Sequence, residues 1–450
     1  MSNIKSPAAL EYDNIGKLLW QYSIPSIIAM VATSLYNIID SIFIGQGVGA
    51  MAISGLAITF PFMNLAAAFG SLIGVGGAAI MSVRLGAKDY RSAEEILGNV
   101  FLLNCITGIL FTVFGLLFLD PVLMFFGASE ATLPYARTFM KILLYGNIIT
   151  HLYFGLNGLI RSSGYPKKAM INVLISVLIN CILAPIFIFV FDMGIAGAAW
   201  ATLIAQASAF VSELFHFFKK SSYIRFKTDI FVLKKNLVYD ITSIGIAPFI
   251  LNACASLIVI VLNRKLLTHG GDLSVGAYGI INRIGTFYVM IVLGLTQGMQ
   301  PIVGYNFGAK KYARALKTFK YTCLCAVCIT TFGFLLGEIF PVQIVSLFTT
   351  DKKLIDISSE GLRIMMIMFP FVGFQMVVSQ FFQSIGKAKE AVFMSLSRQM
   401  LFLLPFLFIF PYFWGTTGVW FSMPMSDFLA TIVALILFVR QLHKFKLQSN

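Results

Sequence analysis

Apolar stretches long enough to cross a membrane recur along the whole chain, and they limit its fold more than any other feature. A spanning helix needs about 20 mostly apolar residues, because the hydrocarbon core of a bilayer is about 30 Å thick. The first half of the chain predicts such helices at 16–42, 52–82, 94–118, 135–158, 168–191 and 194–217. The second half predicts them at 238–264, 274–302, 315–338, 361–383, 390–411 and 416–440. We therefore predict an all-α polytopic membrane protein with twelve transmembrane helices in two six-helix lobes.

The composition argues against a soluble domain and against a nucleic-acid-binding protein. Only 12% of the residues are charged, whereas soluble proteins carry about 25%. The net charge of +14 comes from Lys and Arg residues that lie mostly in short loops between apolar stretches, as topology signals do. The expected partner is thus the lipid bilayer, and no nucleic acid is expected.

The longest polar segment divides the chain into two halves. We predict an N-terminal lobe at 1–218, a cytoplasmic linker at 219–236 and a C-terminal lobe at 237–450. Basic residues concentrate in this linker and in alternate loops, while the loops at 43–51 and 411–416 hold none. Because loops rich in Lys and Arg stay on the cytoplasmic side, both termini are predicted to be cytoplasmic, which requires an even number of spans.

A loop motif occurs once in each half. Arg84–Ala93 reads RLGAKDYRSA, and Asn306–Ala315 reads NFGAKKYARA. A shift of 222 residues superimposes these two loops and also places Gly164 on Gly386. Each half has an even number of spans, so the halves are predicted to run parallel and to be related by an axis along the membrane normal. Transporters of this architecture bind their solute between or within the halves.

Charged residues within the predicted spans are functional candidates, because each costs about 2.5–3.5 kcal/mol at the centre of a bilayer. Within the spans lie Asp40, Arg283, Arg398 and Asp427. Glu213 and Glu338 lie near predicted helix ends, where we expect their carboxylates to reach the membrane interface.

Asp40 is the strongest of these candidates. Tyr36 and Asn37 precede it by four and three residues, so all three share a helix face. Two further polar stripes in the same half consist of Asn172, Ser176 and Asn180, and of Thr202, Gln206 and Glu213. The stripes suggest a polar pocket in this lobe, although such residues often only hydrogen-bond neighbouring helices. A buried carboxylate requires a proton or a cation, which favours a functional role for Asp40.

The second half has a different set of polar residues. Arg398 and Asp427 lie in the last two predicted spans and can pair there, either as a structural ion pair or as part of a binding site. Arg283 and Gln380 complete the polar candidates of this half.

Enzyme and nucleotide-binding motifs are missing from the sequence. It contains no phosphate-binding loop, no HExxH and no GxSxG with plausible partners, and its four histidines have no metal-ligand spacing. We therefore expect a transporter without a resident cofactor or metal. Without a nucleotide site, its energy must come from an ion gradient of H⁺ or Na⁺.

Several segments together resemble the multidrug and toxic compound extrusion (MATE) family, most closely its bacterial MepA-like and DinF-like branch. These segments are Pro25 with Tyr36–Gly45, Arg84–Ala93, Gly158–Arg161 with Gly164, Gln297–Pro301 with Gly304–Ala309, and Ser397–Gln399. The resemblance extends over essentially the whole chain and depends on the order and spacing of all these segments.

The resemblance implies a fold and a function. It implies two six-helix lobes that form a V around a central cavity in a bacterial inner membrane protein, which we expect to be a monomer. It implies export of amphipathic, often cationic, drug-like small molecules, driven by proton or sodium entry. Family coupling residues match Asp40, Asn180 and Thr202, and polar lining positions match Tyr36 and Asn157.

One departure from the family pattern concerns the coupling ion. Relatives often carry an Asp four residues after the matched Asn180, but this chain has Ala184 there. Asp40 is therefore expected to be the main coupling carboxylate. Sodium prefers more oxygen ligands than Asp40, Asn180 and Thr202 supply, which slightly favours a proton over a possible Na⁺ site.

Two other functions remain open from the sequence. A flippase for a lipid-linked precursor would be favoured by a cavity rich in Arg and Lys, and only Arg283 and Arg398 are candidates for such a cavity. An intramembrane enzyme would require paired catalytic groups, and the one available acid pair, Asp40 and Asp427, lies in opposite halves.

Overall fold

The computed structural model describes most of the chain, namely residues 9–48, 50–126, 128, 130, 132–219, 222–348 and 352–449. A few side chains within these ranges, including that of Asn37, lie outside the described part.

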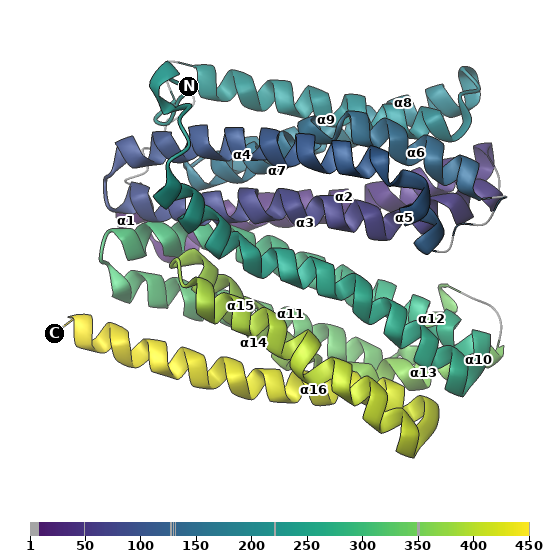
Figure 1. Ribbon diagram of the computed structural model, residues 1–450. Helices are drawn as coiled ribbons and strands as arrows, with labels where there is room; N and C mark the ends of the chain where they lie inside the picture. The colour runs from purple at the N-terminus through teal and green to yellow at the C-terminus, as the bar shows by residue number, and fades with distance from the viewer. Residues whose placement is uncertain are drawn as a thin grey trace.

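The first half of the chain forms one group of helices (Figure 1). They are α1 (Ala9–Tyr12), α2 (Ile15–Gly47), α3 (Ala50–Gly86), α4 (Tyr90–Leu117), α5 (Leu119–Phe125), α6 (Leu133–Tyr145), α7 (Asn147–Ser162), α8 (Pro166–Pro185), a π-helical extension of α8 (Ile186–Val190) and α9 (Gly194–Phe218).

The second half forms the other group after a short 3₁₀ turn (Thr228–Ile230). Its helices are α10 (Lys235–Gly308), α11 (Tyr312–Ile339), α12 (Pro341–Ser346), α13 (Lys352–Met366), α14 (Phe369–Ser384), α15 (Ala388–Leu396), a π-helical segment (Ser397–Leu403) and α16 (Leu404–Ser449).

Twelve membrane crossings follow from the helices of the described residues. Nine of these helices are long and apolar enough to cross alone, and the bent pair α13 and α14 adds a tenth. The continuous run Ala388–Phe445 counts once among the nine, but its 58 residues would extend for about 87 Å as one helix, and Gly415 breaks it with φ of +52°. Helices α6 and α7, which meet at Gly146, complete the set. The predicted twelve-helix fold is confirmed.

The repeated loops have the same backbone geometry in both halves. Lys88 and Lys310, which the sequence repeat superimposes, both have left-handed φ, at 60° and 59°. Gly164 and Gly386, the next equivalent pair, also have positive φ, at 105° and 75°. A left-handed residue ends a helix sharply, so each repeated motif is a helix stop followed by a new helix. Asp89 then caps α4 by accepting a hydrogen bond from the backbone N–H of Ser92 at 3.1 Å.

The two groups of helices are joined at one end of the bundle, and both chain ends lie toward this end, which we call the termini end (Figure 1). Glycines permit the close contact there. A Cβ atom on Gly245 would lie 1.6 Å from the carbonyl oxygen of Leu72, and one on Gly86 would lie 1.8 Å from that of Tyr305. The hydroxyl of Ser23 donates to the carbonyl of Leu295 at 3.2 Å across the same contact. Toward the opposite end the two groups diverge (Figure 1).

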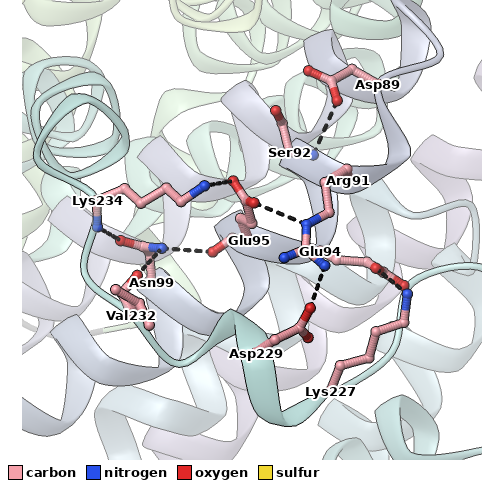
Figure 2. Close-up of polar contacts among 10 residues, drawn as sticks. All are labelled: Asp89, Arg91, Ser92, Glu94, Glu95, Asn99, Lys227, Asp229, Val232 and Lys234. Carbon is pink, nitrogen blue, oxygen red and sulfur yellow. Dashed lines mark hydrogen bonds and ion pairs between the residues drawn. The ribbon is translucent and has the colours of Figure 1, made fainter.

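The linker is attached to the first lobe by ion pairs (Figure 2). Arg91 at the start of α4 bridges Glu95 and Asp229, and Lys227 pairs with Glu94. The bond from Arg91 lowers the pKa of the Asp229 carboxyl below its usual range.

Asn99 fixes the backbone of the same segment. Its amide donates to the carbonyl of Val232 at 3.1 Å, and its oxygen accepts from the backbone N–H of Lys234 at 2.9 Å. The carboxylates of Glu94 and Glu95 are buried against the lobe, and the contacts of the buried Asn99 hold the linker backbone directly. The linker therefore stays with α4 if the two lobes move relative to each other.

Candidate functional site

A cavity of about 280 Å³ lies within the first lobe, between α2, α3 and α6–α9. Most of its wall is apolar and includes Phe60, Met63 and Phe154. Its polar lining residues are Thr33, Tyr36, Asn64, Asn147, Thr150, Tyr153, Ser176, Asn180, Thr202 and Gln206. An apolar cavity with a few convergent polar groups is typical of a small-molecule site.

Thr202 is the centre of the polar group in this cavity. Its hydroxyl donates to the carbonyl of Ala198 at 3.0 Å and accepts from the amide of Asn180 at 3.1 Å. Because that hydroxyl has a single proton, the contact of 3.2 Å with Tyr36 must have the Tyr36 hydroxyl as donor. The structure thus brings together Tyr36, Asn180 and Thr202, three of the residues selected from the sequence.

Asp40 lies one turn beyond Tyr36 on α2 and is 7% exposed. Its Oδ1 atom has no hydrogen-bond partner among the described residues. A buried carboxylate with an unpaired oxygen is costly to ionise, so the group requires a proton or a cation.

Sodium fits this arrangement poorly. The Thr202 oxygen already makes one donated and two accepted hydrogen bonds, which uses its proton and both lone pairs. A sodium ion bound to Asp40 and Thr202 would have to break this network, whereas a proton on Asp40 leaves it intact.

Two predicted lining residues lie elsewhere in the lobe. Asn157 and Asn172 are not among the described residues that line the cavity. Asn157 instead donates to Glu213 Oε1 at 2.9 Å, and Asn172 accepts from the hydroxyl of Ser212 at 2.9 Å. Glu213 itself is 0% exposed, so the expectation that its carboxylate reaches the membrane interface is wrong. The hydrogen bond from Asn157 on α7 holds it inside the lobe.

A comparable cavity of about 310 Å³ lies in the second lobe. Met365, Met366 and Met423 line it together with Arg398 and Asp427. Arg398 Nε donates to Asp427 Oδ1 at 2.7 Å, so the two residues form an ion pair. Arg398 belongs to the π-helical segment, a feature often found at functional sites.

The other polar candidates of this lobe lie outside the cavity. Arg283 is exposed, and Gln380 is half-buried and is not among the described lining residues. Two glutamines that the sequence analysis did not select lie at the cavity or in contact with Asp427. Gln399 lines the cavity, and the amide of Gln375 donates to the carbonyl of Asp427 at 2.6 Å. An amide inside an apolar span was the available signal, and it does not distinguish Gln375 from Gln380.

Replacing Asp427 with Asn should weaken folding more than transport. The change leaves Arg398 without a counter-charge, and because Arg398 is one-third exposed, the expected loss is about 2 kcal/mol of unfolding free energy. Thermal unfolding in detergent measures the loss, and dye efflux per folded molecule should remain near the wild-type value. Unchanged thermal stability with lost efflux would instead show that the pair takes part in transport.

Comparison with known proteins gives a consistent result. The family model MatE matches residues 25–186 and 244–409. Multidrug export protein MepA of Staphylococcus aureus (strain NCTC 8325 / PS 47) is 28% identical over 429 residues, covering 95% of this chain and 94% of the relative. Multidrug export protein MepA of Staphylococcus haemolyticus is 29% identical over 427 residues, with the same coverage.

Solved structures share the fold over the full length. A crystal structure of MATE in the bent conformation superimposes with a TM-score of 0.93 at 24% identity, covering 99% of both chains. An outward-facing conformation of a multidrug resistance MATE family transporter gives a TM-score of 0.92 at 24% identity, covering 99% of this chain and 100% of that one.

Proposed function

The chain belongs to the MatE family of multi-pass membrane transporters and is not an enzyme, and we propose that it exports amphipathic cationic small molecules in exchange for protons. The relatives named multidrug export protein support export of drug-like compounds. Their bacterial origin supports a place in the bacterial cytoplasmic membrane. The basic loops support an orientation with both termini in the cytoplasm.

The observation that carries the proposal is the buried Asp40 beside the Thr202 network. Asp40 Oδ1 has no hydrogen-bond partner within the described part of the chain, and the neighbouring hydroxyl has no free lone pair for a metal ion. The site therefore favours a proton. Asp40 is not among the described residues that line the adjacent cavity, but Tyr36, one turn away, is. A substrate cation held near Tyr36 would compete with the Asp40 proton through its charge, and such competition couples the two fluxes.

The wall of the first cavity supports the substrate class. Aromatic rings such as Phe60 and Phe154 attract cations to their faces, and Met63 and Met140 adapt to irregular apolar ligands. We therefore expect broad specificity for flat lipophilic cations.

The flippase function has less support. An anionic lipid carrier would need free basic side chains in a cavity. Arg283 is exposed and Arg398 is paired with Asp427, so neither of the two candidates is free inside the cavity of the second lobe. The protein is proposed to act as a monomer, since each lobe contains its own cavity.

Purified protein in proteoliposomes tests the function. Efflux of ethidium, a flat lipophilic cation, is followed under an imposed proton gradient, an imposed sodium gradient and no gradient. We expect transport with the proton gradient and loss of transport when an ionophore dissipates it. Transport on the sodium gradient alone would contradict proton coupling, and failure with every cationic dye would contradict the substrate class.

A further inference from the structure

A polar seam extends from the first cavity toward the termini end along the contact of α8 and α9. The part of the seam on α9 consists of Thr202, Gln206 and Glu213, which are four and seven residues apart. The part on α8 consists of Asn172, Ser176 and Asn180, which are four residues apart. These spacings return to the same helix face. Ser176, Asn180, Thr202 and Gln206 line the cavity, whereas Glu213 and Asn172 lie beyond it. The coupling function proposed above does not use this lower part of the seam.

Glu213 is the one carboxyl of the seam, and its surroundings favour the neutral form. It is 0% exposed, and Oε1 accepts from the amide of Asn157 at 2.9 Å. The Oε2 atom has no hydrogen-bond partner among the residues that the structure describes. An ionised carboxylate at such a position is costly, while a protonated one is tolerated.

Titratable side chains lie between Glu213 and the termini end of the bundle. His216 lies on α9 three residues after Glu213, on the same face. Lys168 Nζ donates to His216 Nδ1 at 3.0 Å, so the imidazole is neutral with its proton on Nε2. The other titratable groups that act on Glu213 are Tyr153 on α7 and Lys168 on α8. Beyond these groups α9 ends at Phe218, next to the linker.

The seam is interrupted between the cavity and Glu213. Gln206 makes its side-chain hydrogen bond with Thr150, at 2.5 Å, and the seven residues from Gln206 to Glu213 correspond to about 10 Å along the helix. Within the described residues no hydrogen bond links the two groups. An antiporter requires this break, because a continuous chain from the open cavity to the termini end would conduct protons without exchange.

We propose that Glu213 is a second proton site of the transport cycle. When the lobes rearrange, Glu213 gives its proton to water at the termini end through the His216 side of the seam. With the lobes rearranged, the proton of the Asp40 carboxyl crosses the interrupted stretch of the seam to this carboxylate, which frees Asp40 for a substrate cation. When the substrate leaves on the opposite side of the membrane, Asp40 takes a new proton from that side, so one proton crosses in each cycle and both carboxyls return to their starting state. This inference rests on the proposed proton-coupled function.

The Glu213→Gln variant tests the inference, because Gln keeps the size and the oxygen that accepts from Asn157 but cannot release a proton. Ethidium efflux and lumenal pH are followed in the same proteoliposomes under a proton gradient. We expect about tenfold slower proton-driven efflux, within the usual range for coupling between two sites, with a matching loss of proton flux. Exchange of ethidium between both sides without a gradient should persist, since it needs only the movement of the lobes.

Glu338→Gln is the matched control. This carboxyl lies on α11 of the second lobe, is 32% exposed and is 4.0 Å from Arg363, away from the seam. We expect wild-type coupling from it. If Glu213 only held α7, α8 and α9 together, Glu213→Gln would also keep wild-type coupling, and that result overturns the inference.

Direct labelling of the carboxyl gives a second measurement that does not depend on the variant folding. Dicyclohexylcarbodiimide modifies protonated carboxyls in apolar surroundings, and peptide mapping of the wild-type protein should find the adduct on Glu213. Absence of the adduct at acidic pH overturns the inference. Wild-type protein that moves no protons overturns both proposals, whereas proton-driven efflux that is unchanged in Glu213→Gln overturns this one alone.

Discussion

Asp40→Asn should fold and reach the membrane but lose gradient-driven efflux by about a hundredfold, near the upper end of measured coupling between two sites. Asparagine keeps the size and polarity of the side chain, so the neighbouring network of Tyr36, Asn180 and Thr202 should persist. It cannot exchange a proton for a substrate cation, and the competition that drives antiport disappears. Ethidium efflux under an imposed proton gradient, normalised to protein amount, measures the effect.

Two comparisons make this result specific to coupling. Ethidium exchange without a gradient should fall far less than gradient-driven efflux in Asp40→Asn, because the aromatic wall of the cavity still binds the cation, and this difference separates loss of coupling from loss of lobe movement. Asp427→Asn, which changes the buried acid of the other lobe, should keep coupling per folded molecule. Full coupled efflux by Asp40→Asn would exclude Asp40 as the coupling carboxyl and would make Asp427 the next residue to test.

The fold was accessible from the sequence because the membrane imposes helix length and loop polarity. The sequence repeat also indicated that the two loops share a local geometry, because Lys88 and Lys310, at equivalent positions, have nearly equal left-handed φ angles. The cluster of Tyr36, Asn180 and Thr202 was predictable in part, because helix periodicity fixes which residues share a face. Which faces then meet was supplied by the family resemblance and not by the spacing.

Burial at helix ends was the part that sequence reasoning missed. Glu213 lies five residues before the end of α9, a position where a carboxylate usually reaches the interface, yet it faces Asn157 on α7 and is fully buried. The depth of a residue depends on which neighbouring helices extend past it, and helix spacing does not contain that information. The same limit explains why Gln380 was selected when Gln375 makes the contact with Asp427.

Gly245→Ala should shift the protein away from the conformation in which the lobes are joined at the termini end. The added methyl group would lie 1.6 Å from the Leu72 carbonyl oxygen, whereas ordinary contact begins near 3.4 Å. Neither atom belongs to a flexible side chain, so α3 and α10 must separate. Overpacking of this kind costs about 1–3 kcal/mol. A two-state equilibrium would therefore shift by about five- to 150-fold toward the state with the lobes apart here.

Cysteine accessibility measures the shift in a background without the native cysteines. Ser82 is 1% exposed and its Cβ contacts Gly304 across the same junction, so Ser82→Cys reports whether the lobes are joined there. We expect faster reaction of this thiol with a polar maleimide in Gly245→Ala. Gly279→Ala is the control on the same helix, since no described atom lies within 4 Å of the place that its added methyl group would take. Equal reaction rates in both variants would mean that the glycine contact at Gly245 does not hold the termini end closed.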